Sequence, residues 1–123
     1  MLPRDVENFL SNKPPVAVEL FRLFTKEMQA LGPVHLRPTK TTVAFEATRH
    51  MAYLYAFGKT FVSGVFRFPQ SYEGHLCFFK VGKVAPQSRV YAHHFRLYEP
   101  SDLDEELQVF MKMAYANATS PDA

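Results

Sequence analysis

The sequence predicts an α+β fold with two N-terminal helices, a curved antiparallel sheet of four to six strands and one C-terminal helix. Near both ends of the chain, apolar residues recur every three or four positions, as they do along one side of a helix. In the middle of the chain they recur with a period of two, which is typical of strands. The breaks between these stretches are short, and this favours antiparallel neighbours because parallel strands need long crossovers.

Two helices are expected first, over residues 4–11 and 14–31. The pair Pro14 and Pro15 ends the first one, because a residue that precedes proline is steered away from helical angles. In the second, apolar residues form one continuous stripe, and Gly32 follows as the stop signal. Both helices are therefore expected to be amphipathic.

The C-terminal helix is expected to open after Pro100. Ser101 and Asp104 have the spacing of a capping box, with Asp in place of the usual Glu or Gln. The acidic run over 102–106 suits a helix start, where the dipole favours negative charge, so it needs no metal ion to explain it. Residues 119–123 are expected to be a disordered tail after a single domain over 1–118.

The two central strands have apolar residues on both faces, unlike the half-polar strand before them. Three helices can cover one face of such a sheet well and the other only partly. The remaining aromatic surface then needs a ligand, a partner subunit or a sheet that curls on itself. The expected strands are 34–37, 41–47, 51–57, 60–68, 75–81 and 88–97.

Composition limits the class of protein. Fourteen Lys and Arg against twelve Asp and Glu give a net charge of +2, far from the balance of a dedicated nucleic-acid binder, so nucleic acid is not an expected partner. The single cysteine, Cys77, excludes an internal disulfide framework and favours a cytoplasmic location. No run of about 20 residues is free of charge, so no membrane span is expected.

Catalytic and metal-binding motifs are scarce. His93 and His94 are adjacent on an expected strand and point to opposite faces, so we predict no metal site, and no cofactor motif is present. His75 and Cys77 lie two residues apart on the expected strand 75–81 and share a face, which leaves a small enzyme with a nucleophile and a base as one alternative. A buried, inert thiol explains Cys77 as well.

Basic and aromatic residues are the candidates for ligand binding. Arg37 and Lys40 flank a turn whose hydroxyls and backbone N–H groups can hold a carboxylate or phosphate. The same two cations can instead solvate a sheet edge and protect it from pairing with another chain. The full set of candidates is Arg37, Thr39, Lys40, Tyr53, Tyr55, Arg67, His94 and Arg96.

Two stretches, "PTKTTVAFEATRHMAYLYAF" and "RVYAHHFRLYEPSDLDEELQVFMKMAYANA", carry a resemblance to a known family. With the opening V-E-x-F-L-S-x-K-P-P, they resemble a family of small bacterial domains of unknown function. That family has a P-T-K-x-x-[IV]-A-F turn and strand and a C-terminal L-D-x-E-L helix. The resemblance covers roughly residues 5–117. It implies a curved antiparallel sheet with helices, in domains found alone or joined to predicted transport or DNA-associated proteins, and it assigns no catalytic residue.

The sequence thus favours a non-catalytic module that binds a protein or a small amphipathic or anionic ligand on an aromatic sheet face. Two alternatives remain open. One is a homodimer that buries the same face, and the other is the small enzyme built on His75 and Cys77.

Overall fold

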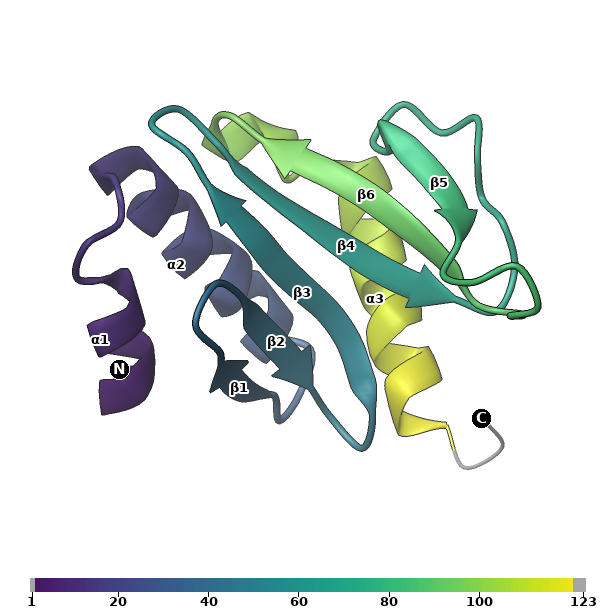
Figure 1. The fold of residues 1–123 in the computed structure, drawn as a ribbon, viewed down its shortest axis with the longest axis horizontal. Helices are drawn as coiled ribbons and strands as arrows, with labels where there is room; N and C mark the ends of the chain where they lie inside the picture. The colour runs from purple at the N-terminus through teal and green to yellow at the C-terminus, as the bar shows by residue number, and fades with distance from the viewer. Residues whose placement is uncertain (1, 121–123) are drawn as a thin grey trace.

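A computed structural model describes residues 2–120 of the chain. Helices stand at both ends and strands lie between them (Figure 1). The α+β class, the three α-helices and the antiparallel sheet that the sequence predicts are therefore confirmed. In chain order the elements are α1 (Arg4–Leu10), α2 (Pro15–Gln29), β1 (His35–Pro38), β2 (Val43–Glu46), β3 (His50–Phe57), β4 (Val62–Phe68), β5 (Lys80–Lys83), β6 (Tyr91–Leu97), the 3-10 turn η1 (Pro100–Asp102) and α3 (Glu105–Thr119).

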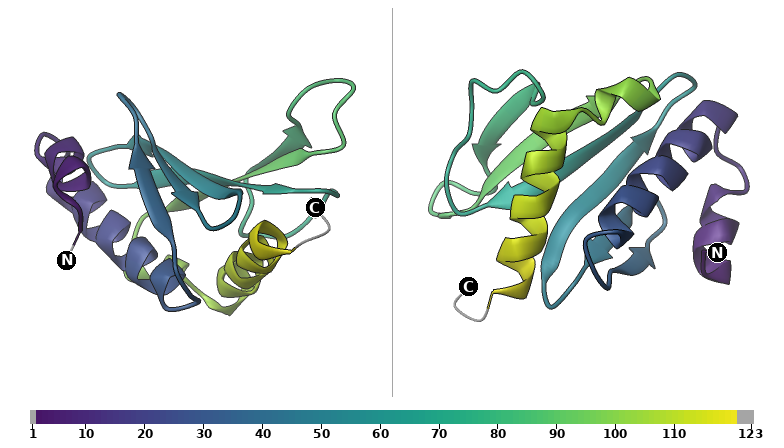
Figure 2. Two further views of the ribbon diagram at one scale, coloured as in Figure 1. Left: turned by 90° about the horizontal axis from the view of Figure 1, so that it is seen from below. Right: turned by 180° about the vertical axis from the view of Figure 1, so that it is seen from behind.

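The six strands form one antiparallel sheet in the order β1-β2-β3-β4-β6-β5. Figure 2 shows α2 and α3 packed on the same side of this sheet, while its two ends curl away from the helices. The opposite side is concave, and within residues 2–120 no helix covers it (Figure 2). The long connection between β4 and β6 leaves room for β5 to join the outer edge of β6.

An aromatic core fills the space between helices and sheet. Phe24 of α2 packs against Phe45 of β2 and stacks on Phe95 of β6, with ring centroids 5.2 and 5.4 Å apart. Phe66 of β4 stacks on Phe95 at 4.7 Å. These rings are buried, and each contributes apolar area that stabilises the fold. The apolar stripe of α2 that the spacing predicts is buried at Ala17, Leu20, Phe21, Phe24 and Met28.

The centre of the sheet needs a glycine at position 64. A Cβ atom there would meet the side chain of Leu54, the ring of Phe95 at 2.6 Å and the carbonyl oxygen of Tyr53 at 2.7 Å. Real Cβ atoms essentially never approach other atoms so closely, so only glycine lets β3 and β6 pack against β4 here.

The expected strand over 75–81 is wrong for most of its length, because β5 begins only at Lys80. Residues 75–79 form a turn in which Phe78 alone is buried, while Leu76 is 97% exposed. The carboxylate of Glu106 accepts the backbone N–H of Cys77 at 3.1 Å and holds this segment against α3. A contact from a distant helix therefore overrides an apolar run that looks like a strand.

The start of the last helix also differs from the prediction. Asp104, not Ser101, is the N-cap of α3, and its carboxylate accepts the N–H of Leu107 at 2.9 Å. Ser101 lies in η1, which has its own capping box between Glu99 and Asp102. The reason is that Pro100 starts a separate short turn before α3 begins.

Thr119, the first residue of the expected tail, is the last residue of α3, and Ser120 is its C-cap. The remainder, 121–123, lies outside the described residues. Within residues 2–120, the helices are too short or too polar to cross a membrane.

Candidate functional site

The concave side of the sheet, which we call the open face, is the side that Figure 1 presents to the viewer. Strand pairing places Tyr53, Val65, His94 and Lys80 in one row across β3, β4, β6 and β5. In the adjacent row, Arg67, Ala92 and Gly82 are partners across β4, β6 and β5. These two rows bring together residues that are up to 41 positions apart in the sequence, as from Tyr53 to His94.

A shallow hollow of about 350 Å³ lies where these rows reach β5. Gly82 and Ala92 face each other across the strand pair, and a Cβ atom on Gly82 would meet nothing within 4 Å. The hollow thus exists because two neighbouring positions carry almost no side chain. Its lining, which we call the basic hollow, consists of Val65, Arg67, Lys80, Gly82, Lys83, Val84, Ala92 and His94.

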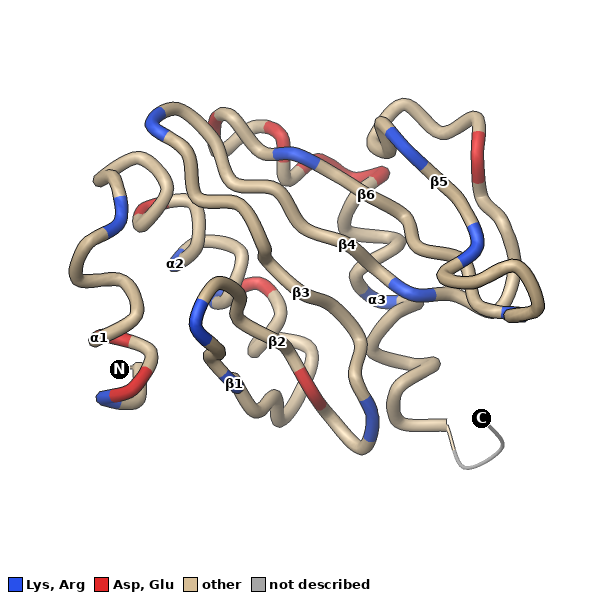
Figure 3. Tube along the Cα trace, in the orientation of Figure 1, with Lys and Arg blue, Asp and Glu red and all other residues tan. Residues whose placement is uncertain are grey.

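Positive charge gathers around the basic hollow. Figure 3 shows blue segments at the end of β4 and along β5, where Arg67, Lys80 and Lys83 lie. All three side chains are exposed, and none forms an ion pair with a carboxylate among residues 2–120. No Asp or Glu lines the hollow. Three cations without a carboxylate partner in the described part of the chain make a local field that attracts anions.

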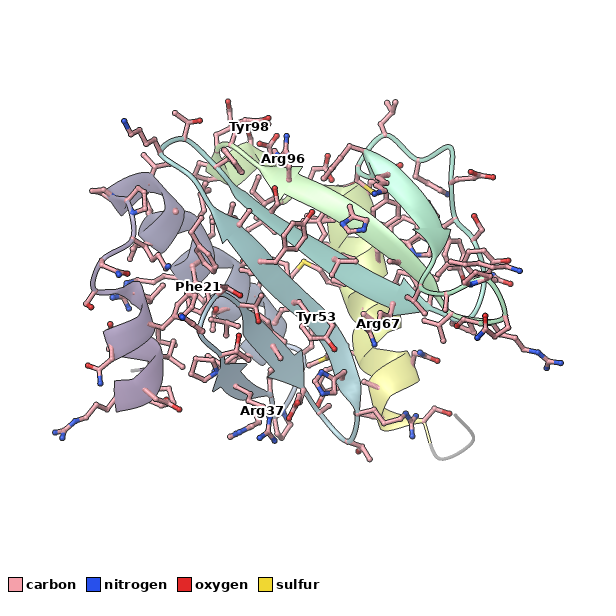
Figure 4. The ribbon with its side chains drawn as sticks, viewed as in Figure 1. Phe21, Arg37, Tyr53, Arg67, Arg96 and Tyr98 are labelled. Atoms are coloured by element: carbon pink, nitrogen blue, oxygen red, sulfur yellow. The ribbon has the colours of Figure 1, made fainter. Side chains whose placement is uncertain are left out.

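Arg67 is held in place by an aromatic ring. Its guanidinium carbon lies 5.0 Å from the centroid of Tyr53, and Figure 4 shows the two side chains side by side in front of the sheet. The ring of Tyr53 in turn stacks on His50 at 5.3 Å. A guanidinium stacked on an aromatic face keeps its edge N–H groups free to bind a carboxylate or a phosphate.

Arg96 is more fully engaged. Its guanidinium carbon lies 4.9 Å from the ring of Phe61 and 4.6 Å from that of Phe79, and its Nε donates to Ser63 Oγ at 2.8 Å. Tyr98 lies close by at the end of β6 (Figure 4). Arg96 thus bridges aromatic side chains at the far end of the open face and does not line the basic hollow.

The two adjacent histidines point to opposite faces, as the strand pattern predicts. His93 is buried, with Nε2 accepting the N–H of Tyr72 and Nδ1 facing the carbonyl of Tyr91, both at 3.0 Å. His94 faces the basic hollow, and its Nδ1 lies 3.0 Å from the hydroxyl of Tyr55. Burial lowers the pKa of both histidines, and the Lys80 ammonium lowers that of His94 further. Neutral His94 can accept the Tyr55 hydroxyl at Nδ1 and keep its own N–H on Nε2.

The turn between β1 and β2 stands apart from the hollow, and its polar groups are occupied. Arg37 binds Glu46 through Nε and Nη2, which raises the pKa of Arg37 and lowers that of Glu46. The hydroxyl of Thr39 accepts the N–H groups of Thr41 and Thr42. Lys40 is exposed beside them. The structure therefore groups Tyr53, Tyr55, Arg67 and His94 at or beside the hollow, with Arg37, Thr39 and Lys40 elsewhere.

His75 and Cys77 do not lie on a strand, so they lack the shared strand face that was expected for a nucleophile and a base. Both contact Glu106 of α3 instead. His75 Nδ1 lies 3.1 Å from Glu106 Oε2, and this contact lowers the pKa of Glu106. Burial, together with the nearby Glu106 carboxylate, raises the pKa of the Cys77 thiol to about 12. A thiol with such a pKa is protonated at neutral pH, so this geometry gives the enzyme alternative no support.

A second hollow, of about 620 Å³, is also lined by Arg67. Its other arginine, Arg49, donates to the carbonyls of Asn117 and Ser120 at the end of α3 and is therefore less available to a ligand. Within residues 2–120, no three His, Cys, Asp or Glu side chains come together as metal ligands would.

Sequence reasoning missed Lys80, Gly82 and Lys83. They lie in or just beyond the segment that was expected as a strand over 75–81, and nothing in the sequence pairs that segment with β6. The signal that could have found them is the pattern K-V-G-K, a short strand with cations at both ends and no side chain in the middle.

Comparison with known proteins identifies the family. The model of the family described as "Domain of unknown function (DUF5655)" matches residues 6–118. The chain belongs to this family. The match confirms the resemblance to a domain of unknown function, and it extends over all three helices and all six strands except the first two residues of α1 and the last residue of α3. Neither the search of curated proteins nor that of solved structures found a match.

Proposed function

We propose that this DUF5655 domain is a non-catalytic binding module that holds a small anionic molecule in the basic hollow of its open face. The observation that carries the proposal is the cluster of Arg67, Lys80 and Lys83 around a preformed hollow without a described carboxylate. Its size lies within the range of about 300–1,000 Å³ that small-molecule sites occupy. An apolar floor with a few convergent charged groups is the usual composition of such sites.

The charge of the open face also bears on the homodimer alternative. In a twofold dimer the same patch meets its own copy, so a dimer through this face would bring the cations of two hollows together. Like charges in an interface cost several kcal/mol unless anions separate them. An anionic ligand fits the surface better than a second copy of the chain.

The test is a titration of ¹⁵N-labelled protein with 8-anilinonaphthalene-1-sulfonate, which carries both an aromatic system and a negative charge. We expect saturable shifts of the backbone amides of β4, β5 and β6, and little change in α2 and α3. Shifts confined to the helices, or none up to millimolar dye, would overturn the proposal.

Two double variants give a matched control. Lys80→Ala with Lys83→Ala removes two charges from the hollow, and Lys26→Ala with Lys112→Ala removes two exposed charges from the helices. Both leave the chain with the same net charge. We expect the first pair to weaken dye binding at least tenfold and the second to leave it within twofold. Equal losses would show that only overall charge matters, which contradicts a specific site.

A further inference from the structure

The shape of the basic hollow limits what can enter it. Its floor is the small surface of Gly82 and Ala92, with Val65 beside them, and it is open toward solvent. The side chain of Val65 is nearly buried, so the floor is apolar and firm. A compact group can sit on this floor while the surrounding cations reach it from the rim.

The number and kind of cations indicate the charge of the occupant. Arg67, Lys80 and Lys83 supply three positive charges, and no described Asp or Glu lines the hollow or pairs with them. One carboxylate brings a single negative charge, whereas a phosphate monoester brings nearly two and three terminal oxygens. A stacked guanidinium and paired ammonium groups are the side chains that recognise phosphate.

Aromatic groups lie next to the cations, on the side of His94. The ring of Phe79 lies 5.9 Å from that of His94 and is half exposed, and the ring of Tyr55 approaches His94 from another side. A planar ring attached to the phosphate could therefore stack on the imidazole and phenyl surfaces while its phosphate stays among the cations. Stacking of a base on an aromatic side chain contributes about 1–3 kcal/mol and tolerates any base.

We infer that the ligand of the basic hollow is a phosphate monoester of a molecule with a planar ring, such as a nucleoside monophosphate. The phosphate contacts Arg67, Lys80 and Lys83, and the ring stacks beside His94 and Phe79. This inference rests on the proposed function and specifies its ligand. The same chemistry occurs in a free nucleotide and at the phosphorylated end of a nucleic-acid strand, so the test includes both sources.

The experiment measures, by isothermal titration calorimetry and by amide shifts, the binding of four probes to the whole chain. They are adenosine 5′-monophosphate, ribose 5-phosphate, which lacks the planar base, adenosine, which lacks the phosphate, and a 5′-phosphorylated oligothymidylate. We expect adenosine 5′-monophosphate to bind at least tenfold more tightly than either of its two parts. If the oligonucleotide binds at least tenfold more tightly than adenosine 5′-monophosphate, and its affinity falls steeply with salt, the site belongs to a strand end. The salt dependence is expected because contacts to several phosphates release counterions. Equal affinity would assign it to the free nucleotide.

Gly82→Val fills the hollow without changing any charge. Valine suits a strand, and the space above Gly82 is empty, so the variant is expected to fold. We expect at least a tenfold loss of affinity for adenosine 5′-monophosphate, with an unchanged circular dichroism spectrum. Unchanged affinity would overturn the inference.

The two proposals can fail separately. If the sulfonate dye shifts β4, β5 and β6 but adenosine 5′-monophosphate binds no better than ribose 5-phosphate or adenosine, the phosphate-and-ring inference is wrong and anion binding stands. If neither probe shifts these strands, both proposals are wrong.

Discussion

Alanine at Gly64 and at Gly82 should have opposite effects on stability, although both glycines lie in strands of the same sheet. A Cβ atom at position 64 would come within 2.6 Å of the Phe95 ring and 2.7 Å of the Tyr53 carbonyl oxygen, and still closer to Leu54. At position 82 it would meet nothing within 4 Å. The pair therefore compares one methyl group in a filled space with the same group in an empty one.

The magnitude at position 64 follows from how little its neighbours can move. Leu54 and Phe95 are buried, and the oxygen of Tyr53 belongs to the backbone of the adjacent strand. Forcing an extra methyl group into such packing costs about 1–3 kcal/mol. For a chain of 123 residues, a loss of ~2 kcal/mol corresponds to a fall in melting temperature of roughly 8 °C.

At position 82 alanine is expected to raise the free energy of unfolding, whereas at position 64 it lowers it. Neither glycine has a backbone φ in the left-handed region, so alanine is compatible with both conformations. Alanine restricts the unfolded chain more than glycine does, which stabilises the folded state by about 0.4–1 kcal/mol where no clash occurs. Urea unfolding followed by far-UV circular dichroism measures both effects. If Gly64→Ala unfolds at the wild-type midpoint, or Gly82→Ala loses as much as Gly64→Ala, the packing described for the sheet is wrong.

Three further outcomes test other parts of the structure. Because its pKa is raised to about 12, the Cys77 thiol should react with a disulfide reagent at pH ~8 roughly 100-fold or more slowly in the native chain than in urea, and equal rates would contradict this pKa. His93 has a lowered pKa in the folded state, so its contribution to stability is present above pH 6.5 and is lost as the pH falls through the folded value. The urea midpoint of the wild type should therefore be lower at pH ~5 than at neutral pH. The same comparison in His93→Asn should show a smaller loss. The pKa of Glu106 is lowered as well, so its contribution is present above pH 4.5 and disappears as the pH falls further. Glu106→Gln should be less stable than the wild type at neutral pH, and the two should converge at pH ~3.

The helices could be predicted closely from the sequence because their signals are local. The apolar stripe of α2, the prolines at its start and the acidic residues at the start of α3 are each signals that act within a few residues of the chain. The exact N-cap of α3 was missed because the spacing of Ser101 and Asp104 fits a capping box that begins at Ser101, whereas Asp104 itself caps the helix. The choice depends on Pro100, which begins a separate turn.

The strand edges and the basic hollow could not be predicted in the same way. The segment 75–79 is apolar, but it forms a turn that is held by a backbone hydrogen bond from Phe78 to His75 and by the contact of Cys77 with Glu106 of α3. Gly82 lies opposite Ala92 because β5 pairs with the outer edge of β6, and no local pattern specifies that partner. Arg67 and His94 were both candidates from the sequence, but their common side of the sheet follows from the pairing of β4 with β6, and the two lysines that complete the cluster depend on the pairing of β5 with β6.

The structure also changes the reason for expecting a ligand. From the sequence, the argument was a surplus of apolar surface on the central strands. In the fold, Arg67 covers Tyr53, and Arg96 lies against Phe61 and Phe79, so the chain shields part of this surface with its own guanidinium groups. Arginine stacked on aromatic rings can replace a helix as a cover for a sheet face. The half-exposed ring of Phe79 and the small floor at Gly82 stay accessible, and the floor is surrounded by cations without carboxylate partners among residues 2–120. The case for a ligand therefore rests on unbalanced charge at a preformed hollow, and hydrophobic surface plays the smaller part.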